Sequence, residues 1–384
     1  MATPASFRID IPQANIDAIR ARIGAFPWFP APSDEGDQWL RGVNTAYFKD
    51  FCAYWLSTYD WRAAEAELNR FPQCLVTIDG LDLHCVHVVG EAGGARPLIL
   101  SHGWPGSHYE FWGVIEKLAF PSRFGGSSAD AFDVVVPSLP GYGFSGKPDK
   151  PLGQRATAAL FDKLMRALGY PRYLAQGGDW GSMVSSFLAL DHEACVGAHL
   201  NMVALRTADV QPETDEEKGW AQTFQFMFQL EGGYFQQQAT KPQTLAMALM
   251  DSPVGAAAWI LEKFHGWSDL RGGGLEAAYT KDQLLTNIMI YLVTNSMATS
   301  VWYYRARIEE GGLFLPAGTR VDKPIGVANF VNEPVYKTPP RSFAARMYNI
   351  VHWSDIDRGG HFAAMEAPDL FTADVRAFAR AIRY

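Results

Sequence analysis

The stretch Gly177-Gly-Asp-Trp-Gly181 joins two segments of different pattern. The short apolar run Tyr173-Leu-Ala175 before it is typical of a buried strand, and the run Ser182-Met-Val-Ser-Ser-Phe-Leu-Ala-Leu190 after it fits a helix. A strand, a tight glycine-rich turn and a helix form the context of a nucleophile elbow, Gly-x-Ser-x-Gly, here with Asp179 at the serine position. The alternative is an ordinary glycine-rich turn whose aspartate caps the helix.

Other short apolar runs, separated by helical patterns, surround this turn. Strands that alternate with helices predict a mostly parallel sheet covered by helices on both faces, an α/β fold. The runs are Pro97-Leu-Ile-Leu100, Phe132-Asp-Val-Val-Val136, Tyr173-Leu-Ala175, Val196-Gly-Ala-His-Leu200, Ile325-Gly-Val-Ala328 and Asn349-Ile-Val351.

The alternation stops between residues 207 and 318, where the pattern shows no convincing strand, only helix-length aromatic stretches. These are Trp220 to Phe235, Leu245 to Phe264 and Leu284 to Ile308. We therefore expect an α/β core at 73–206 and 319–384, interrupted by a helical cap at 207–318. Residues 1–72 carry aromatic side chains at helical spacings and are expected to form an arm that wraps the core.

A hairpin is expected where period-two apolar positions flank Asp79-Gly80. A two-residue turn there would place Cys74 opposite Cys85. We expect this pair to be reduced.

Composition excludes several classes of protein. The chain of 384 residues is 48% hydrophobic with a net charge of −8, so it has no basic footprint for nucleic acid. It shows no signal-peptide pattern and no apolar run of about 18 residues, which argues against a membrane anchor. With only four cysteines we expect a reduced, cytoplasmic protein.

No cofactor or metal is expected. Gly141-Tyr-Gly-Phe-Ser-Gly146 spells a dinucleotide fingerprint, but Pro137 and Pro140 interrupt the required strand-to-helix turn. No Cys-x-x-Cys pair occurs, and His84 and His87 point to opposite faces of one strand.

Two further loops carry candidate catalytic groups. His102-Gly-Trp-Pro105 follows a strand at the usual place of an oxyanion-hole loop, so the backbone N–H groups of Trp104 and Trp180 could converge on one oxyanion. The expected order of nucleophile, acid and histidine points to His361 as the base, because it follows the flexible Asp357-Arg-Gly-Gly360 loop. Glu333 is preferred as the acid that orients it.

Two other acids stay open for that role, Asp355 and Asp357, which are closer to the histidine in sequence.

An aspartate nucleophile suits displacement at a saturated carbon, followed by hydrolysis of the resulting ester by histidine-activated water. The leaving group is then an epoxide oxygen or a halide. An opening epoxide becomes a basic alkoxide and needs acidic O–H donors. The predicted cap offers Tyr234 and the pair Tyr303-Tyr304.

Several motifs resemble the microsomal-type branch of the epoxide hydrolases, in the α/β-hydrolase superfamily. They are His102-Gly-Trp-Pro105, Gly177-Gly-Asp-Trp-Gly181, Arg358-Gly-Gly-His-Phe-Ala-Ala364, Asp251-Ser-Pro-Val-Gly255, Ile260-Leu-Glu-Lys-Phe264 and Asn287-Ile-Met-Ile-Tyr291. The resemblance extends from the N-terminal arm to the C-terminus.

The resemblance implies Asp179 as nucleophile, His361 as base and Glu333 as the orienting acid. It also implies Tyr234 and Tyr304 as the ring-opening tyrosines. The segment after Glu333 is slightly longer than the family pattern. The expected activity is addition of water to a hydrophobic epoxide to give a vicinal diol.

Two alternative functions remain: a haloalkane dehalogenase, because Asp179-Trp180 suits both chemistries, and a non-catalytic binding protein on the same scaffold. The expected partners are the epoxide and water. The oligomeric state, monomer or homodimer, and the particular epoxide stay open.

Overall fold

A nine-stranded sheet forms the centre of the computed structural model, which describes residues 3–93, 96–311 and 314–384. Its strand order is β1-β2-β3-β5-β4-β6-β7-β8-β9. The strands are β1 (Ala5–Phe7), β2 (Gln73–Ile78), β3 (Leu81–Val88), β4 (Arg96–Ser101), β5 (Phe132–Pro137), β6 (Tyr173–Gly177), β7 (Cys195–Leu200), β8 (Val321–Phe330) and β9 (Tyr348–Ile356).

The predicted mostly parallel sheet is confirmed. The pairings from β5 through β9 are all parallel, and only β1, β2 and β3 add antiparallel pairs at one side. Strands β5 and β6 are buried along their whole length, as strands covered on both faces should be.

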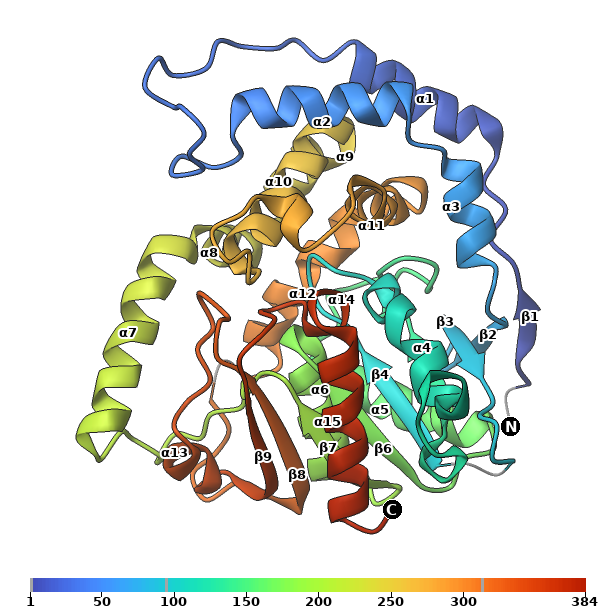
Figure 1. Ribbon diagram of the computed structural model, residues 1–384, viewed down its shortest axis with the longest axis vertical. Helices are drawn as coiled ribbons and strands as arrows, with labels where there is room; N and C mark the ends of the chain where they lie inside the picture. The colour runs from blue at the N-terminus through green and yellow to red at the C-terminus, as the bar shows by residue number, and fades with distance from the viewer. Residues whose placement is uncertain (1–2, 94–95, 312–313) are drawn as a thin grey trace.

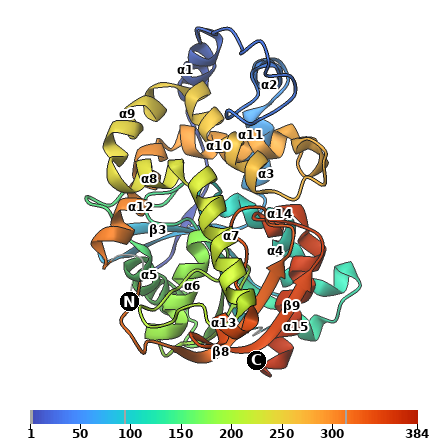
Figure 2. The same cartoon turned by 90° about the vertical axis from the view of Figure 1, so that its left-hand side faces the viewer.

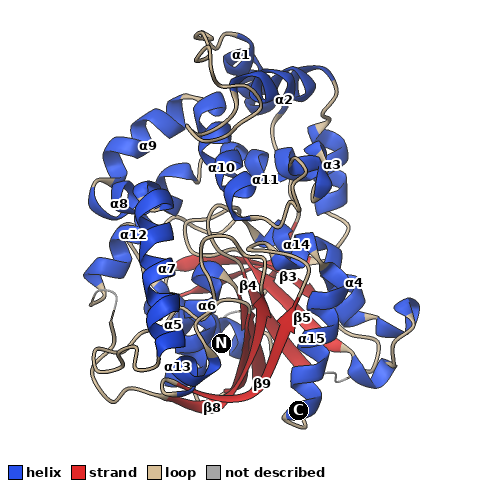
Figure 3. Ribbon diagram, turned by 60° about the vertical axis from the view of Figure 1, so that its left-hand side comes forward, coloured by secondary structure: helices blue, strands red, loops and turns tan. Residues whose placement is uncertain are grey.

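Helices cover both faces of the sheet (Figure 3). On one face α4 (Trp112–Ala119) packs with α15 (Pro368–Ala381). On the other, α5 (Gln154–Ala167) packs with α6 (Asp179–Asp191), which begins directly after β6. Two short helices, α13 (Arg341–Ala345) and α14 (Ala363–Glu366), flank β9 in sequence.

Six α-helices follow one another between β7 and β8 in the described residues. The first of them runs down along the side of the sheet, and the other five stand above it (Figures 1 and 2). The six are α7 (Asp215–Glu231), α8 (Gly233–Thr240), α9 (Pro242–Asp251), α10 (Pro253–Trp267), α11 (Lys281–Val293) and α12 (Met297–Glu309). We refer to this group as the cap helices.

Each of the three long helices expected in the cap is in fact two. Gly232 separates α7 from α8. Between α9 and α10 the chain bends by 116°, where the Ser252 hydroxyl caps α10 and Pro253 cannot continue α9. Between α11 and α12 it bends by 87°, and Asn295 there has a φ of +52°.

No single described helix is long and apolar enough to cross a membrane. Two pairs of consecutive helices, α9 with α10 and α11 with α12, would have the length and apolar composition of a membrane span only if each bent pair is counted as one helix.

The N-terminal arm, residues 3–72, contacts both the sheet and the cap helices (Figure 1). Strand β1 pairs with β2, while α1 (Gln13–Gly24) packs on α10 and α3 (Trp61–Leu68) packs on α11. The Tyr54 hydroxyl, from α2 (Thr45–Ser57), donates to Asp282 of α11 at 2.9 Å.

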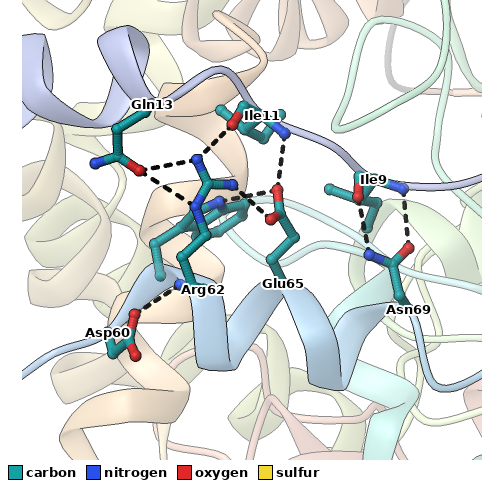
Figure 4. Close-up of polar contacts among 8 residues, drawn as sticks. Ile9, Ile11, Gln13, Asp60, Arg62, Glu65 and Asn69 are labelled. Carbon is teal, nitrogen blue, oxygen red and sulfur yellow. Dashed lines mark hydrogen bonds and ion pairs between the residues drawn. The ribbon is translucent and has the colours of Figure 1, made fainter.

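Side chains of α3 and its C-terminal end hold the extended segment between β1 and α1 (Figure 4). Asn69 exchanges two hydrogen bonds of 2.9 Å with the backbone of Ile9. Glu65 accepts from the Ile11 N–H at 2.8 Å, and Arg62 donates to the Ile11 carbonyl at 2.7 Å. Every backbone group that these contacts satisfy would otherwise need a solvent partner.

The β2–β3 hairpin has the expected two-residue turn, with Asp79 and Gly80 both at positive φ. Cys74 therefore pairs with Cys85 across the ladder, as predicted. Both cysteines are free.

Candidate active site

The turn between β6 and α6 holds Asp179 in a left-handed conformation, with a φ of +47°. Such a φ is costly for a residue with a side chain and persists only where its surroundings enforce it. Glycine is sterically required at positions 177 and 181, on either side of Asp179. A Cβ on Gly177 would lie 2.1 Å from the Gly181 carbonyl oxygen, and one on Gly181 would lie 1.8 Å from that of Ser101.

The two carboxylate oxygens of Asp179 have different surroundings. Oδ1 accepts a hydrogen bond of 2.9 Å from the Trp104 backbone N–H, in the loop after β4. Oδ2 lies 3.4 Å from Nε2 of His361. The Trp180 N–H, the other group expected in an oxyanion hole, follows Asp179 at the start of α6. One oxygen is thus held by an amide, and the other faces the imidazole.

His361 lies in the loop after β9, and Glu333 lies in the loop after the neighbouring strand β8. Nδ1 of His361 is 3.7 Å from Oε1 of Glu333. The backbone N–H of His361 donates to the backbone carbonyl of Trp267 at 3.0 Å. Asp355 and Asp357 are exposed, and the described residues show no ion pair of either with His361. Geometry therefore favours Glu333 as the carboxylate beside the imidazole.

The ionisation of His361 depends on these two carboxylates. Burial opposes the charged imidazole, but the nearby carboxylates of Asp179 and Glu333 outweigh it and raise the pKa of His361 to about 10. In the resting protein at neutral pH the ring is therefore an imidazolium between two carboxylates.

Two tyrosines from different cap helices approach the same place. Tyr234 of α8 stacks on the Trp104 ring at 5.3 Å between centroids, and the Tyr304 ring of α12 meets the Trp180 ring edge-on at 4.7 Å. Burial raises the pKa of both phenols well above 10, so both are protonated at neutral pH. The Tyr304 hydroxyl is buried and has no hydrogen-bond partner among the described residues.

The sequence did not point to Tyr336, which lies three residues after Glu333. Its hydroxyl lies 2.5 Å from that of Tyr234, and its ring centroid is 5.6 Å from that of His361. It falls in the loop that is longer than the family pattern, and this extra length was the one signal that could have drawn attention to it.

The sequence analysis also missed two carboxyl groups. Glu366 accepts hydrogen bonds from the N–H groups of Gly360 and Phe362, on either side of His361, at 2.9 and 2.8 Å. Burial raises its pKa to about 7. Burial likewise raises the pKa of Glu110 to about 8, and the charges of Asp179 and His361 both act on it. The position of Glu366, five residues after the histidine, was a usable signal.

The described residues contain no group of three or more His, Cys, Asp or Glu side chains placed to hold a metal ion. The groups that the described residues bring together at this site are carboxylates, an imidazole, phenols and backbone amides.

Asp179 lies on a strained turn at the carboxyl end of a central parallel strand, and the loop after β4 directs a backbone N–H at its carboxylate. This arrangement is typical of the α/β hydrolases. Family models agree: residues 4–111 match "Epoxide hydrolase N terminus" and residues 96–249 match "alpha/beta hydrolase fold".

Known proteins resemble the chain along nearly its whole length. It is 36% identical to Epoxide hydrolase 1 of Sus scrofa, over 97% of this chain and 87% of that protein. The structure of Aspergillus niger epoxide hydrolase matches with a TM-score of 0.84 and 32% identity, over 98% of this chain and 96% of that one. Juvenile hormone epoxide hydrolase from the silkworm Bombyx mori matches with a TM-score of 0.88 and 31% identity, over 100% and 95%.

The chain belongs to the microsomal-type epoxide hydrolases, with their N-terminal region and α/β-hydrolase fold. The predicted family and fold are confirmed.

Proposed function

We propose that this enzyme converts a hydrophobic epoxide and water to a vicinal diol through a covalent ester on Asp179. The observation that carries the proposal is that the two oxygens of the Asp179 carboxylate have different contacts. Its Oδ1 is held by the Trp104 N–H, its Oδ2 faces His361, and two buried phenols from the cap helices contact the rings of Trp104 and Trp180, whose backbones adjoin it.

In the first step Oδ2 attacks an epoxide carbon, and the carbon–oxygen bond of the ring breaks as the ester bond forms. The departing oxygen takes a proton from a phenol. Tyr304 suits this role because its hydroxyl has no partner in the resting protein and is free to bind the epoxide oxygen. Tyr234 can act with it, and Tyr336 donates to the Tyr234 oxygen as charge develops there.

Ester formation also changes His361. It removes the negative charge of Asp179, which is one of the two influences that hold the His361 pKa near 10. Burial, which disfavours the imidazolium, is then opposed by Glu333 alone, so the pKa falls. The imidazole can therefore lose its proton after alkylation and become the general base for the second step.

In the second step His361 takes a proton from water, and the resulting hydroxide attacks Cγ of Asp179. The negative charge then appears on Oδ1, which already lies at the Trp104 N–H. Collapse of this intermediate breaks the ester bond, the leaving oxygen takes the proton that His361 removed from water, and the diol is released. One oxygen of the restored carboxylate now comes from water.

A single turnover in heavy-oxygen water tests the covalent route. Digestion and mass spectrometry should find label in the peptide with Asp179, and the first diol should carry none from water. Direct attack of water on the epoxide would instead label the diol and leave Asp179 unlabelled, and this result would refute the proposal.

A bromoalkane substrate separates the dehalogenase alternative. The double variant Tyr234→Phe, Tyr304→Phe should lose epoxide turnover. Bromide release by the wild-type protein that survives in this variant would favour the dehalogenase, and epoxide turnover at the wild-type level would contradict the ring-opening role of the phenols.

A further inference from the structure

A pair of cysteines outside the active site faces across the β2–β3 hairpin. Sγ of Cys74 and Sγ of Cys85 lie 3.0 Å apart without a covalent bond. The His87 N–H donates to the Pro72 carbonyl at 3.0 Å, and hydrogen-bonded pairs alternate along an antiparallel ladder. Cys74 and Cys85, two positions further on, therefore also form a hydrogen-bonded pair, with Cα atoms about 5.5 Å apart.

That separation lies within the range of about 4.4 to 6.8 Å spanned by disulfides. The Sγ atoms, 3.0 Å apart, must approach by about 1 Å to reach the S–S bond length of about 2.05 Å.

The two thiols are not equivalent. A hydrogen bond from Cys85 lowers the pKa of Cys74, and the same contact, together with burial, raises the pKa of Cys85 well above its usual value. Since the thiolate is the reactive form of cysteine, Cys74 is the thiol that attacks the oxidant, and Cys85 is the resolving cysteine that reacts in the second step.

Access favours the same thiol. A surface cavity of about 390 Å³ opens at Cys74, between the start of the chain and the end of α5, and its other lining residues include Pro4, Pro72, His87 and Leu168. Cys85 has no exposed surface. A small oxidant can therefore reach Cys74 without the hairpin opening.

We propose that Cys74 and Cys85 are a reversible oxidation site for hydroperoxides. The Cys74 thiolate attacks one peroxide oxygen and the O–O bond breaks, which gives a sulfenic acid on Cys74 and reduces the peroxide to an alcohol or water. The Cys85 sulfur then attacks the Cys74 sulfur, a disulfide forms and the oxygen leaves as water. A dithiol reductant returns both thiols.

The location determines what the bond would affect. Strand β2 carries β1 of the N-terminal arm, with Ser6 paired to Cys74, whereas Asp179 follows β6, beyond β5 and β4. Oxidation would fasten the hairpin that anchors the arm and leave the catalytic groups untouched.

The chain supplies its own controls. Cys52 and Cys195 are buried, and burial raises the pKa of each to about 12, so both should resist the oxidant.

The test uses the full-length protein, treated with hydrogen peroxide and then denatured and alkylated with N-ethylmaleimide. Intact mass should show four adducts before treatment and two after it, and four again after dithiothreitol. Peptide mapping should find Cys74 linked to Cys85. Four adducts after treatment, or loss of the adduct at Cys52 or Cys195 instead, would overturn the proposal.

Single variants test the order of the steps. Cys85→Ser should leave a sulfenic acid on Cys74 that dimedone captures, because no second thiol displaces it. Cys74→Ser should leave Cys85 unmodified under the same conditions. Equal capture in both variants would contradict the assigned roles, and the wild-type adduct count tests the pair even if one variant folds poorly. No readout depends on epoxide turnover, so this proposal can fail independently of the proposed function.

Discussion

Replacing Tyr304 by phenylalanine should affect activity and stability in opposite directions. Its hydroxyl is buried without a hydrogen-bond partner among the described residues, in a side chain that is 1% exposed. A buried unsatisfied hydroxyl costs about 1–3 kcal/mol. Its removal should leave the free energy of unfolding unchanged or raise it by about 1 kcal/mol.

The rate of ring opening should fall in the same variant. In the transition state the hydroxyl donates to an oxygen that gains negative charge, and hydrogen bonds to charged groups contribute about 1.5–3 kcal/mol. At 1.4 kcal/mol per factor of ten, the alkylation rate should fall by about 10- to 150-fold. Rapid quenching of enzyme in excess over epoxide measures this step directly, and urea unfolding measures stability.

The neighbouring Tyr303 gives a matched control. Its hydroxyl donates to Thr157 at 2.8 Å, so Tyr303→Phe removes a satisfied hydrogen bond from an equally buried side chain. We expect it to lower the free energy of unfolding by about 1 kcal/mol and to leave the alkylation rate within twofold of wild type. If Tyr304→Phe destabilised the fold and reacted at the wild-type rate, the hydroxyl would be structural and the reasoning refuted.

Three further outcomes follow from the structure. His361→Gln should alkylate but not hydrolyse, so epoxide should disappear rapidly in an amount equal to the enzyme and then stop, and repeated turnover would contradict its role as base. Burial lowers the pKa of His84 to about 3 and that of His108 well below 6.5, so the stability that these two neutral histidines contribute is fully present above about pH 6.5 and is lost as the pH drops toward 3. NMR titration of the imidazole resonances between pH 7 and 4 measures this directly, because the raised pKa values of Glu110 and Glu366 act on overall stability in the opposite direction. An imidazole of His84 or His108 that titrates near pH 6.5 would show that it is not held neutral. Asn69→Ala removes two hydrogen bonds to Ile9 and should lower the free energy of unfolding by about 1–3 kcal/mol, and an unchanged urea midpoint would show that this clamp contributes nothing.

The central strands were predictable because both their faces are buried. β5 and β6 read as short apolar runs that the sheet covers completely. The edge strand β9 extends to Ile356, well beyond the expected run at Asn349 to Val351, because one side of an edge strand faces solvent and accepts polar residues such as Asp355.

The cap was predicted as helical but not its division into shorter helices. Proline at 253 and glycine at 232 are recognisable breakers, but Asn295 is a weaker signal, because asparagine adopts a positive φ more often than most residues yet also occurs within helices.

In the active site, the residues that motif spacing identified are the ones in sharply constrained turns, such as Asp179. Tyr336 was missed because its contact with Tyr234 joins a loop to helix α8, 102 residues away in the sequence, and no local pattern encodes such a contact.

The N-terminal arm closes a ring of contacts. It is joined to the sheet through β1 and to the cap through Tyr54 and Asp282, while the cap is joined to the sheet at both of its own ends. A cap tethered on three sides cannot swing away as a hinged lid without losing one of these attachments. Substrate should therefore enter, and diol leave, by movements smaller than the opening of the whole cap.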